Sequence, residues 1–177
     1  SNLVNNSGVV AADVTGVGTA RTQLAATGYG TDTAIFGYGG AASGRVSITN
    51  LVSNLGVVGT DVTGVGTASR HKAAASYGGD KAIFGYGLNN AGAKISVTNL
   101  VSSSGVVASD VSGVGTARSL LAAASYGGDK AIFAYGDTGS ASSLSNLVNS
   151  SGVVASDVTG VGTARYGLAA AGYSNAA

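Results

Sequence analysis

Residues 98–117 read TNLVSSSGVVASDVSGVGTA, and this stretch decides the fold because close copies of it recur along the chain. The copies begin at residues 1, 49, 98 and 145, so successive units are 48, 49 and 47 residues long. Self-similarity at a spacing of roughly 20 to 50 residues is the signature of a repeat protein, in which each unit packs against its neighbours. We therefore expect one repeat domain over residues 1–177, with units at 1–48, 49–97 and 98–144 and a partial unit at 145–177.

The order of apolar residues inside a unit predicts β-strands. Phe36 and Tyr38 share one face of an extended segment, whereas Gly37 takes the other. The Ala-rich run of each unit is too short for a stable isolated helix. Four strands, typified by the second unit and the start of the third, are expected at 73–77, 81–86, 94–101 and 105–111. Two-residue hairpin turns are predicted at Thr31-Asp32, Gly79-Asp80 and Gly128-Asp129.

Composition excludes several classes of function. The 177 residues carry nine Lys and Arg against eight acids, so there is no basic field for nucleic acid or for an anionic membrane. The chain has no Cys, which removes disulfides and thiolate metal sites. Its apolar runs are all shorter than about 18 residues, so membrane insertion is not expected. We expect no cofactor.

The third unit resembles a kelch-type repeat. An Arg at 118, a small-residue strand at 121–124, a turn at 126–130 and an apolar strand closed by glycine at 131–136 follow the order of that family. The resemblance implies an all-β fold of kelch-like β-propeller blades. Each repeat of about 48 residues would form four antiparallel strands, giving three full blades plus a split partial blade. The double glycine of the family is Gly-Tyr-Gly here, and its Trp is absent.

The near identity of the units also resembles repeats in proteins of marine phages. The phrase GVVASD stands at 105–110 and 152–157, and GGDKAIF stands at 78–84 and 127–133. This resemblance implies a location in a virion or outside the cell. The partners that it implies are other copies of the chain, other virion proteins, or a glycan or protein on a host surface.

An Asp followed by Val, Thr or Ser, and Gly recurs in every unit, and it resembles the start of the calcium loops of integrin-type blades. A calcium ion takes about six to eight oxygen ligands, and each of these loops offers a single carboxylate. We therefore expect the Asp to accept backbone N–H groups of its own turn instead. The recurring residues are Asp13, Asp61, Asp110 and Asp157.

Arginines and tyrosines recur in register. In the second unit Ser69 occupies the arginine position and Arg70 follows it. The arginines could form a ring for an acidic ligand, and the tyrosines could form a platform for sugars. Their repetition in every unit favours packing between blades. The residues concerned are Arg21, Arg118, Arg165, Tyr38, Tyr86 and Tyr135.

Catalytic chemistry has little support. His71 is the only histidine, and the chain has neither Glu nor Cys to accompany it. We expect His71 to lie exposed beside Arg70 and Lys72. Enzymes that resemble galactose oxidase need a Cys, and those that resemble sialidase need an arginine triad that is not found here. The chain is predicted to be non-enzymatic.

Three segments vary between units while the rest stays constant. They lie near 40–44, 88–93 and 137–142, and exposed loops on a constant frame are suited to recognition. The residues expected to contact a ligand are Gly40, Ser43, Asn89, Asn90, Asp137 and Thr138.

Three functions fit these features. The first is a structural or recognition protein of a virion or of the cell exterior, which binds a receptor or a glycan. The second is an intracellular kelch-like adapter for a protein partner. The third is an ice-binding or surface-coating β-solenoid, although no regular Thr-x-Thr ladder is present.

Overall fold

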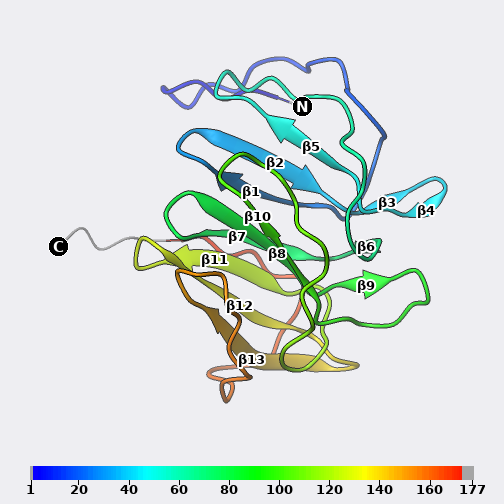
Figure 1. Ribbon diagram of the computed structural model, residues 1–177, viewed down its shortest axis with the longest axis vertical. Helices are drawn as coiled ribbons and strands as arrows, with labels where there is room; N and C mark the ends of the chain where they lie inside the picture. The colour runs from blue at the N-terminus through cyan, green and yellow to red at the C-terminus, as the bar shows by residue number, and fades with distance from the viewer. Residues whose placement is uncertain (1, 173–177) are drawn as a thin grey trace.

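The computed structural model describes residues 2–172, and in that range the chain forms thirteen β-strands and no helix (Figure 1). The all-β prediction is therefore confirmed. Nothing in this range could cross a membrane as a helix. All strand pairs are antiparallel, as expected for short strands that are joined by tight turns.

Three sheets repeat one strand order. An Ala-rich inner strand pairs with the Ile-Phe strand, and that strand pairs in turn with the Asn-Leu-Val strand. The first sheet contains β1 (Ala25–Tyr29), β2 (Thr33–Gly37) and β5 (Thr49–Val52). The second contains β7 (Ala73–Tyr77), β8 (Lys81–Gly85) and β10 (Thr98–Val101). The third contains β11 (Ala122–Tyr126), β12 (Lys130–Asp137) and β13 (Ala141–Val148).

Two small ribbons lie beside the ends of these sheets. One is a hairpin of β3 (Gly40–Ala41) and β4 (Gly44–Arg45), within the first variable segment. The other pairs β6 (Ser69–Arg70) with β9 (Leu88–Asn89). Figure 1 places both ribbons on the same side of the molecule.

The prediction of a fourth regular strand in each unit is wrong. The segment at 105–111 forms no regular ladder with β10, and its backbone pairs with that strand at the isolated bridges Val101↔Val107 and Thr98↔Val111. Between these bridges β10 advances three residues while the outer segment advances four, so one extra residue bulges out and breaks the ladder. The equivalent segments of the neighbouring units carry the same pair of bridges at Val58 and Val62 and at Val154 and Val158.

The expected strand over 94–101 is regular only from Thr98 onward. Its partner β8 ends at Gly85, just before the left-handed residues Tyr86 (φ 64°) and Gly87 (φ 110°). Left-handed backbone interrupts the ladder at this point, and the equivalent Tyr135 and Gly136 cause a register shift inside β12. The strand that the sequence predicts at 81–86 is thus one residue shorter.

The inner hairpins have three-residue turns and not two-residue turns. Tyr77 pairs with Lys81, so the turn is Gly78-Gly79-Asp80. Gly78 and Gly79 have φ values of 62° and 79°, which only glycine adopts at little cost. The Gly78 amide then donates to the Asp129 carbonyl of the next unit over 2.7 Å. The missed first glycine is therefore the residue that links neighbouring turns.

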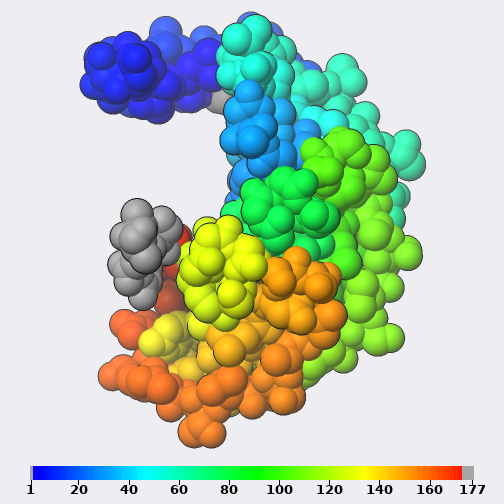
Figure 2. Space-filling view, turned by 60° about the vertical axis from the view of Figure 1, so that its left-hand side comes forward, coloured from blue at the N-terminus to red at the C-terminus, as the bar shows by residue number. Residues whose placement is uncertain are grey.

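Neighbouring sheets pack against each other, and together they form an arc around a hollow, which the space-filling view shows (Figure 2). Two buried clusters fill the two spaces between sheets. Phe84 meets Tyr38 of the preceding unit edge to face, with ring centroids 5.2 Å apart, and Phe133 meets Tyr86 in the same geometry. The core is therefore built between units, as in other repeat proteins.

The two end segments contribute parts of further units. Near the N-terminus a bridge joins Val4 to Val10, as in the third and outer segments of the complete units. Near the C-terminus Arg165 bridges Ser142, and the Gly167 amide donates to the Leu120 carbonyl over 2.8 Å. Ser1 and Tyr173, which the repeat pattern includes, lie outside the described residues.

Candidate functional site

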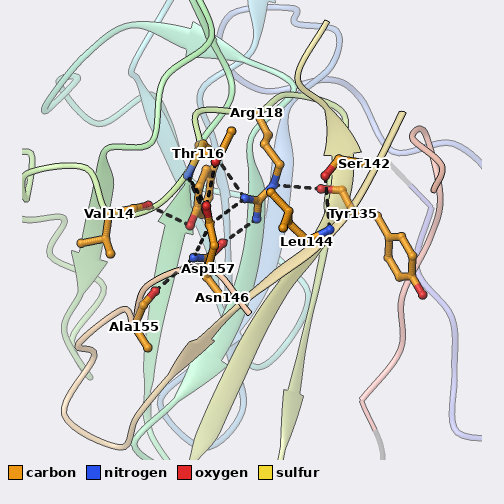
Figure 3. Close-up of polar contacts among 10 residues, drawn as sticks. Val114, Thr116, Arg118, Tyr135, Ser142, Leu144, Asn146, Ala155 and Asp157 are labelled. Atoms are coloured by element: carbon orange, nitrogen blue, oxygen red, sulfur yellow. Dashed lines mark hydrogen bonds and ion pairs between the residues drawn. The ribbon is translucent and has the colours of Figure 1, made fainter. Parts of the chain in front are cut away.

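A polar cluster ties the strands of each unit together at one end. At the third sheet, Asp157 of the partial unit accepts hydrogen bonds from the Thr116 amide over 3.0 Å and from its hydroxyl over 2.7 Å (Figure 3). Asn146 donates to Asp157 over 2.9 Å and to the Ala155 carbonyl over 3.0 Å. Thr116 precedes the inner strand, Asn146 lies in β13 and Asp157 lies in the outer bulge. The cluster therefore closes the unit from its innermost to its outermost segment.

The aspartates therefore do not act as we expected from the sequence. Asp110 accepts from Thr67, which is 43 residues earlier, and from Asn99, which is 11 residues earlier. The bulge in the outer segment is what aims the carboxylate at these distant donors. Within residues 2–172 no three His or Asp side chains are arranged to hold a metal ion.

Arg118 completes the cluster in the third unit. Its side chain is fully buried and donates to the Asn146 amide oxygen over 2.7 Å. It also donates to the Tyr135 carbonyl over 2.9 Å and to the Thr116 carbonyl over 3.1 Å. One guanidinium nitrogen lies 3.5 Å from Asp157. A buried guanidinium thus has several acceptors, which is what its burial requires.

Arg118 and the in-register Arg165 each also cover a tyrosine ring of the preceding unit. The guanidinium carbon of Arg118 lies 4.6 Å from the Tyr86 ring centroid, and that of Arg165 lies 4.6 Å from the Tyr135 centroid. A cation over an aromatic face is attracted by the ring quadrupole. The Arg and Tyr positions singled out in the sequence therefore meet across the junctions between units. Arg21 donates to the Ile48 carbonyl and to Asn50, and it has no such ring among the described residues.

In the second unit a lysine replaces the arginine. Lys72 is buried, donates to the Asn99 amide oxygen over 3.3 Å and lies 4.5 Å above the Tyr38 ring. Sequence reasoning missed this residue and considered Arg70 instead. Two coupled differences between the units could have revealed it. Ser69 stands where the other units have Arg, and Lys72 stands where they have Leu24 or Leu121. A cation three residues further along thus reaches the same position.

Burial lowers the pKa of the Lys72 ammonium to about 8, and the carboxylate of Asp110 opposes this shift. Burial also raises the pKa of Asp110, but the hydrogen bonds from Thr67 and Asn99 outweigh it, so the pKa lies below its usual value. Both groups are therefore charged near neutral pH, although burial disfavours the charged form of the lysine.

Stability should rise with pH because of Lys72. Its pKa is about 8 when folded and about 10.4 when unfolded, so the unfolded state binds the proton more tightly between these values. Relative to Lys72→Met, the free energy of unfolding is expected to rise by about 2 kcal/mol from pH 7.5 to 10. Urea unfolding at a series of pH values measures it. The Lys130→Met variant, which removes a half-buried lysine paired with Asp129, should show no such rise. A flat difference for Lys72→Met would contradict the assignment.

The recurring tyrosines of the middle strands, which follow β2 and β8 and lie near the end of β12, are packing residues in this structure. Tyr38 and Tyr86 are fully buried, and each hydroxyl donates to a valine carbonyl over 3.2 Å, that of Val65 and Val114 respectively. Buried rings cannot serve as a platform for sugars. Tyr135 is half-buried and donates to Val161 over 3.2 Å.

The three variable loops form one continuous edge. The Arg45 side chain of β4 donates to the Asn89 carbonyl, and the Arg45 amide donates to the Asn90 side chain over 3.1 Å. In the next pair of loops, Lys94 lies 3.1 Å from Asp137. Loops that follow each other at intervals of one unit are thus joined side by side.

The loop residues singled out in the sequence are mostly accessible. Ser43 and Asn90 are exposed, whereas Gly40, Asn89, Asp137 and Thr138 are half-buried. His71 is half-buried and not exposed, because it follows Arg70 at the ribbon formed by β6 and β9. Burial and the nearby Arg70 lower the pKa of His71, which keeps the imidazole neutral at pH 7.

No protein-family model matches this chain, and a search of curated proteins finds no similar sequence.

Proposed function

We propose that this chain is a non-enzymatic recognition protein of a virion or of the cell exterior. Its constant polar clusters hold three variable loops in one row, and the row binds a glycan on a host surface. The observation that supports this proposal is the continuous edge itself, in which Arg45 joins the first loop to Asn89 and Asn90, and Lys94 joins the second loop to Asp137.

The chemistry of the edge suits a glycan. Asn90, Ser43 and Thr138 offer amide and hydroxyl groups, and Asp137 offers a carboxylate that can accept two sugar hydroxyls. A row of such groups with few large apolar side chains binds through many polar contacts. The resemblance of the repeats to those of phage proteins is the reason for proposing a virion or extracellular location.

We also propose that the three sheets are kelch-like blades of a β-propeller. Four features support this arrangement: the meander order within each sheet, the inner strands of small residues, the outer bulged segment and the arc around a hollow (Figure 2). In such a fold the variable loops occupy one face of the ring, which is where propellers present binding residues.

The loop proposal is tested on a printed glycan array. Replacing 41–44, 89–93 and 137–141 by Gly-Ser sequences of equal length should abolish binding of the purified chain, because the amide, hydroxyl and carboxylate side chains proposed to contact the glycan are removed. A matched control changes Asp80 and Asp129 to Ser in the turns at the other end of the strands. Glycan binding that survives the loop replacement would refute the proposal.

A further inference from the structure

The first unit has an open pocket on the face that the later units bury. The pocket has a volume of about 410 Å³, and its lining includes Val17, Arg21, Phe36 and Asn50. Its size falls within the range of sites that enclose small ligands or peptide side chains. The same four positions recur in the later units, so the structure itself shows what covers them.

In the second unit the equivalent face is covered by the end of β2, the middle strand of the first sheet. Phe84 packs so closely on Gly37 that a Cβ there would lie 2.8 Å from the ring. The ring of Tyr38 lies under the Lys72 ammonium, and its hydroxyl bonds to the Val65 carbonyl. In the third unit Gly85 and Tyr86 cover Phe133 and Arg118 in the same manner. Two junctions thus use one Gly-Tyr recognition pattern.

A backbone contact completes the pattern. The amide of the glycine after the tyrosine donates to the carbonyl at the arginine position, from Gly39 to Ser69 over 2.9 Å and from Gly87 to Arg118 over 2.8 Å. In the first unit the corresponding carbonyl is that of Arg21, the corresponding valine is Val17 and the corresponding ring is Phe36. All three groups are at the pocket.

We propose that this pocket binds an extended segment of sequence Ile-Phe-Gly-Tyr-Gly, as a further unit of the same repeat supplies. The first glycine lies on Phe36, the tyrosine ring lies under Arg21, and the tyrosine hydroxyl donates to Val17. The occupant is not a second copy of this chain. The equivalent strand at the other end of the arc carries Ala134 where the contact needs glycine, and a Cβ at that position would strike the incoming Phe ring.

The test uses fluorescence anisotropy with a labelled peptide of the sequence at 81–88, KAIFGYGL. The 177-residue chain should bind this peptide. A peptide with Ala in place of Tyr should bind at least about tenfold more weakly, because the cation-π contact and the hydrogen bond of the buried hydroxyl are lost. A peptide with Val for the first Gly should not bind. These peptide variants leave the folding of the protein unaffected.

Protein variants locate the site. Arg21→Ala should weaken peptide binding about tenfold, whereas Arg165→Ala, the in-register arginine at the far end, should leave it unchanged. Absence of peptide binding, or equal binding of the Tyr and Ala peptides, would overturn the proposal. Sedimentation that shows a dimer competing with the peptide would overturn the choice of occupant.

Discussion

Arg118→Ser is expected to lower the free energy of unfolding by about 3 to 5 kcal/mol. The change leaves the buried oxygens of Asn146 and Tyr135 without their donor, and it opens a cavity over the Tyr86 ring. An unpaired buried acceptor costs far more than a surface contact. Urea unfolding followed by circular dichroism measures the loss, with the slope of the transition as a check that the folded state stays compact.

The second unit supplies a rescue for this variant. There Ser69 and Lys72 perform the task that Arg118 and Leu121 share in the third unit. The double variant Arg118→Ser with Leu121→Lys should therefore be at least about 1 kcal/mol more stable than Arg118→Ser alone.

Two comparisons make the rescue specific. Leu121→Lys in the presence of Arg118 should be destabilising, because it buries a second cation with no acceptor. Arg165→Ala removes an exposed arginine and should cost less than about 1 kcal/mol. If adding Leu121→Lys to Arg118→Ser fails to restore stability, the two cations do not occupy equivalent positions.

The repeat pattern was sufficient to predict the sheets. The Ala-rich strand is a run of small residues and the Ile-Phe strand is apolar, and the predicted bounds of 73–77 and 81–86 agree with β7 and, to within one residue, with β8. These strands pair with each other inside one unit, so local sequence contains most of the information that they need. The near identity of the units then implied three similar sheets.

The same reasoning failed for the outer segment at 105–111, because the geometry of that segment depends on distant partners. The segment Gly-Val-Val-Ala-Ser-Asp-Val is rich in valine, as a strand would be. The extra residue before Val111 is needed to aim Asp110 at Thr67, which lies in the connection to the preceding unit. The local sequence of this segment carries no information about a contact 43 residues away.

The sequence singled out the recurring tyrosines, but it did not predict their backbone conformation. Tyr38, Tyr86 and Tyr135 all have φ near 60°, which is unfavourable for an aromatic residue. Propensity therefore predicts extended backbone at these positions. At Tyr38 and Tyr86 the burial of the ring against the next unit compensates for the strain, and that burial becomes visible only when two units are seen together.

The largest effect of a substitution without charge should come from Gly85→Val. Its Cβ would lie 2.7 Å from the tip of the Phe133 ring, and the branched side chain adds two more carbons in the same space. Overpacking of this kind costs about 3 kcal/mol or more, because the ring can retreat only by separating the second sheet from the third. Valine favours strands more than glycine does, so the backbone itself would not account for a loss.

Ala134→Val provides the matched control for this variant. Residue 134 is the counterpart of Gly85 in the third unit, and the chain has no fourth Phe to pack against it. The control should change stability by less than about 1 kcal/mol. Shortening the opposing ring in Gly85→Val with Phe133→Ala should recover part of the loss, since the two positions share one space. Equal losses at residues 85 and 134 would instead show that valine disturbs the middle strand itself. In that case the glycine would not be required by the aromatic contact between units.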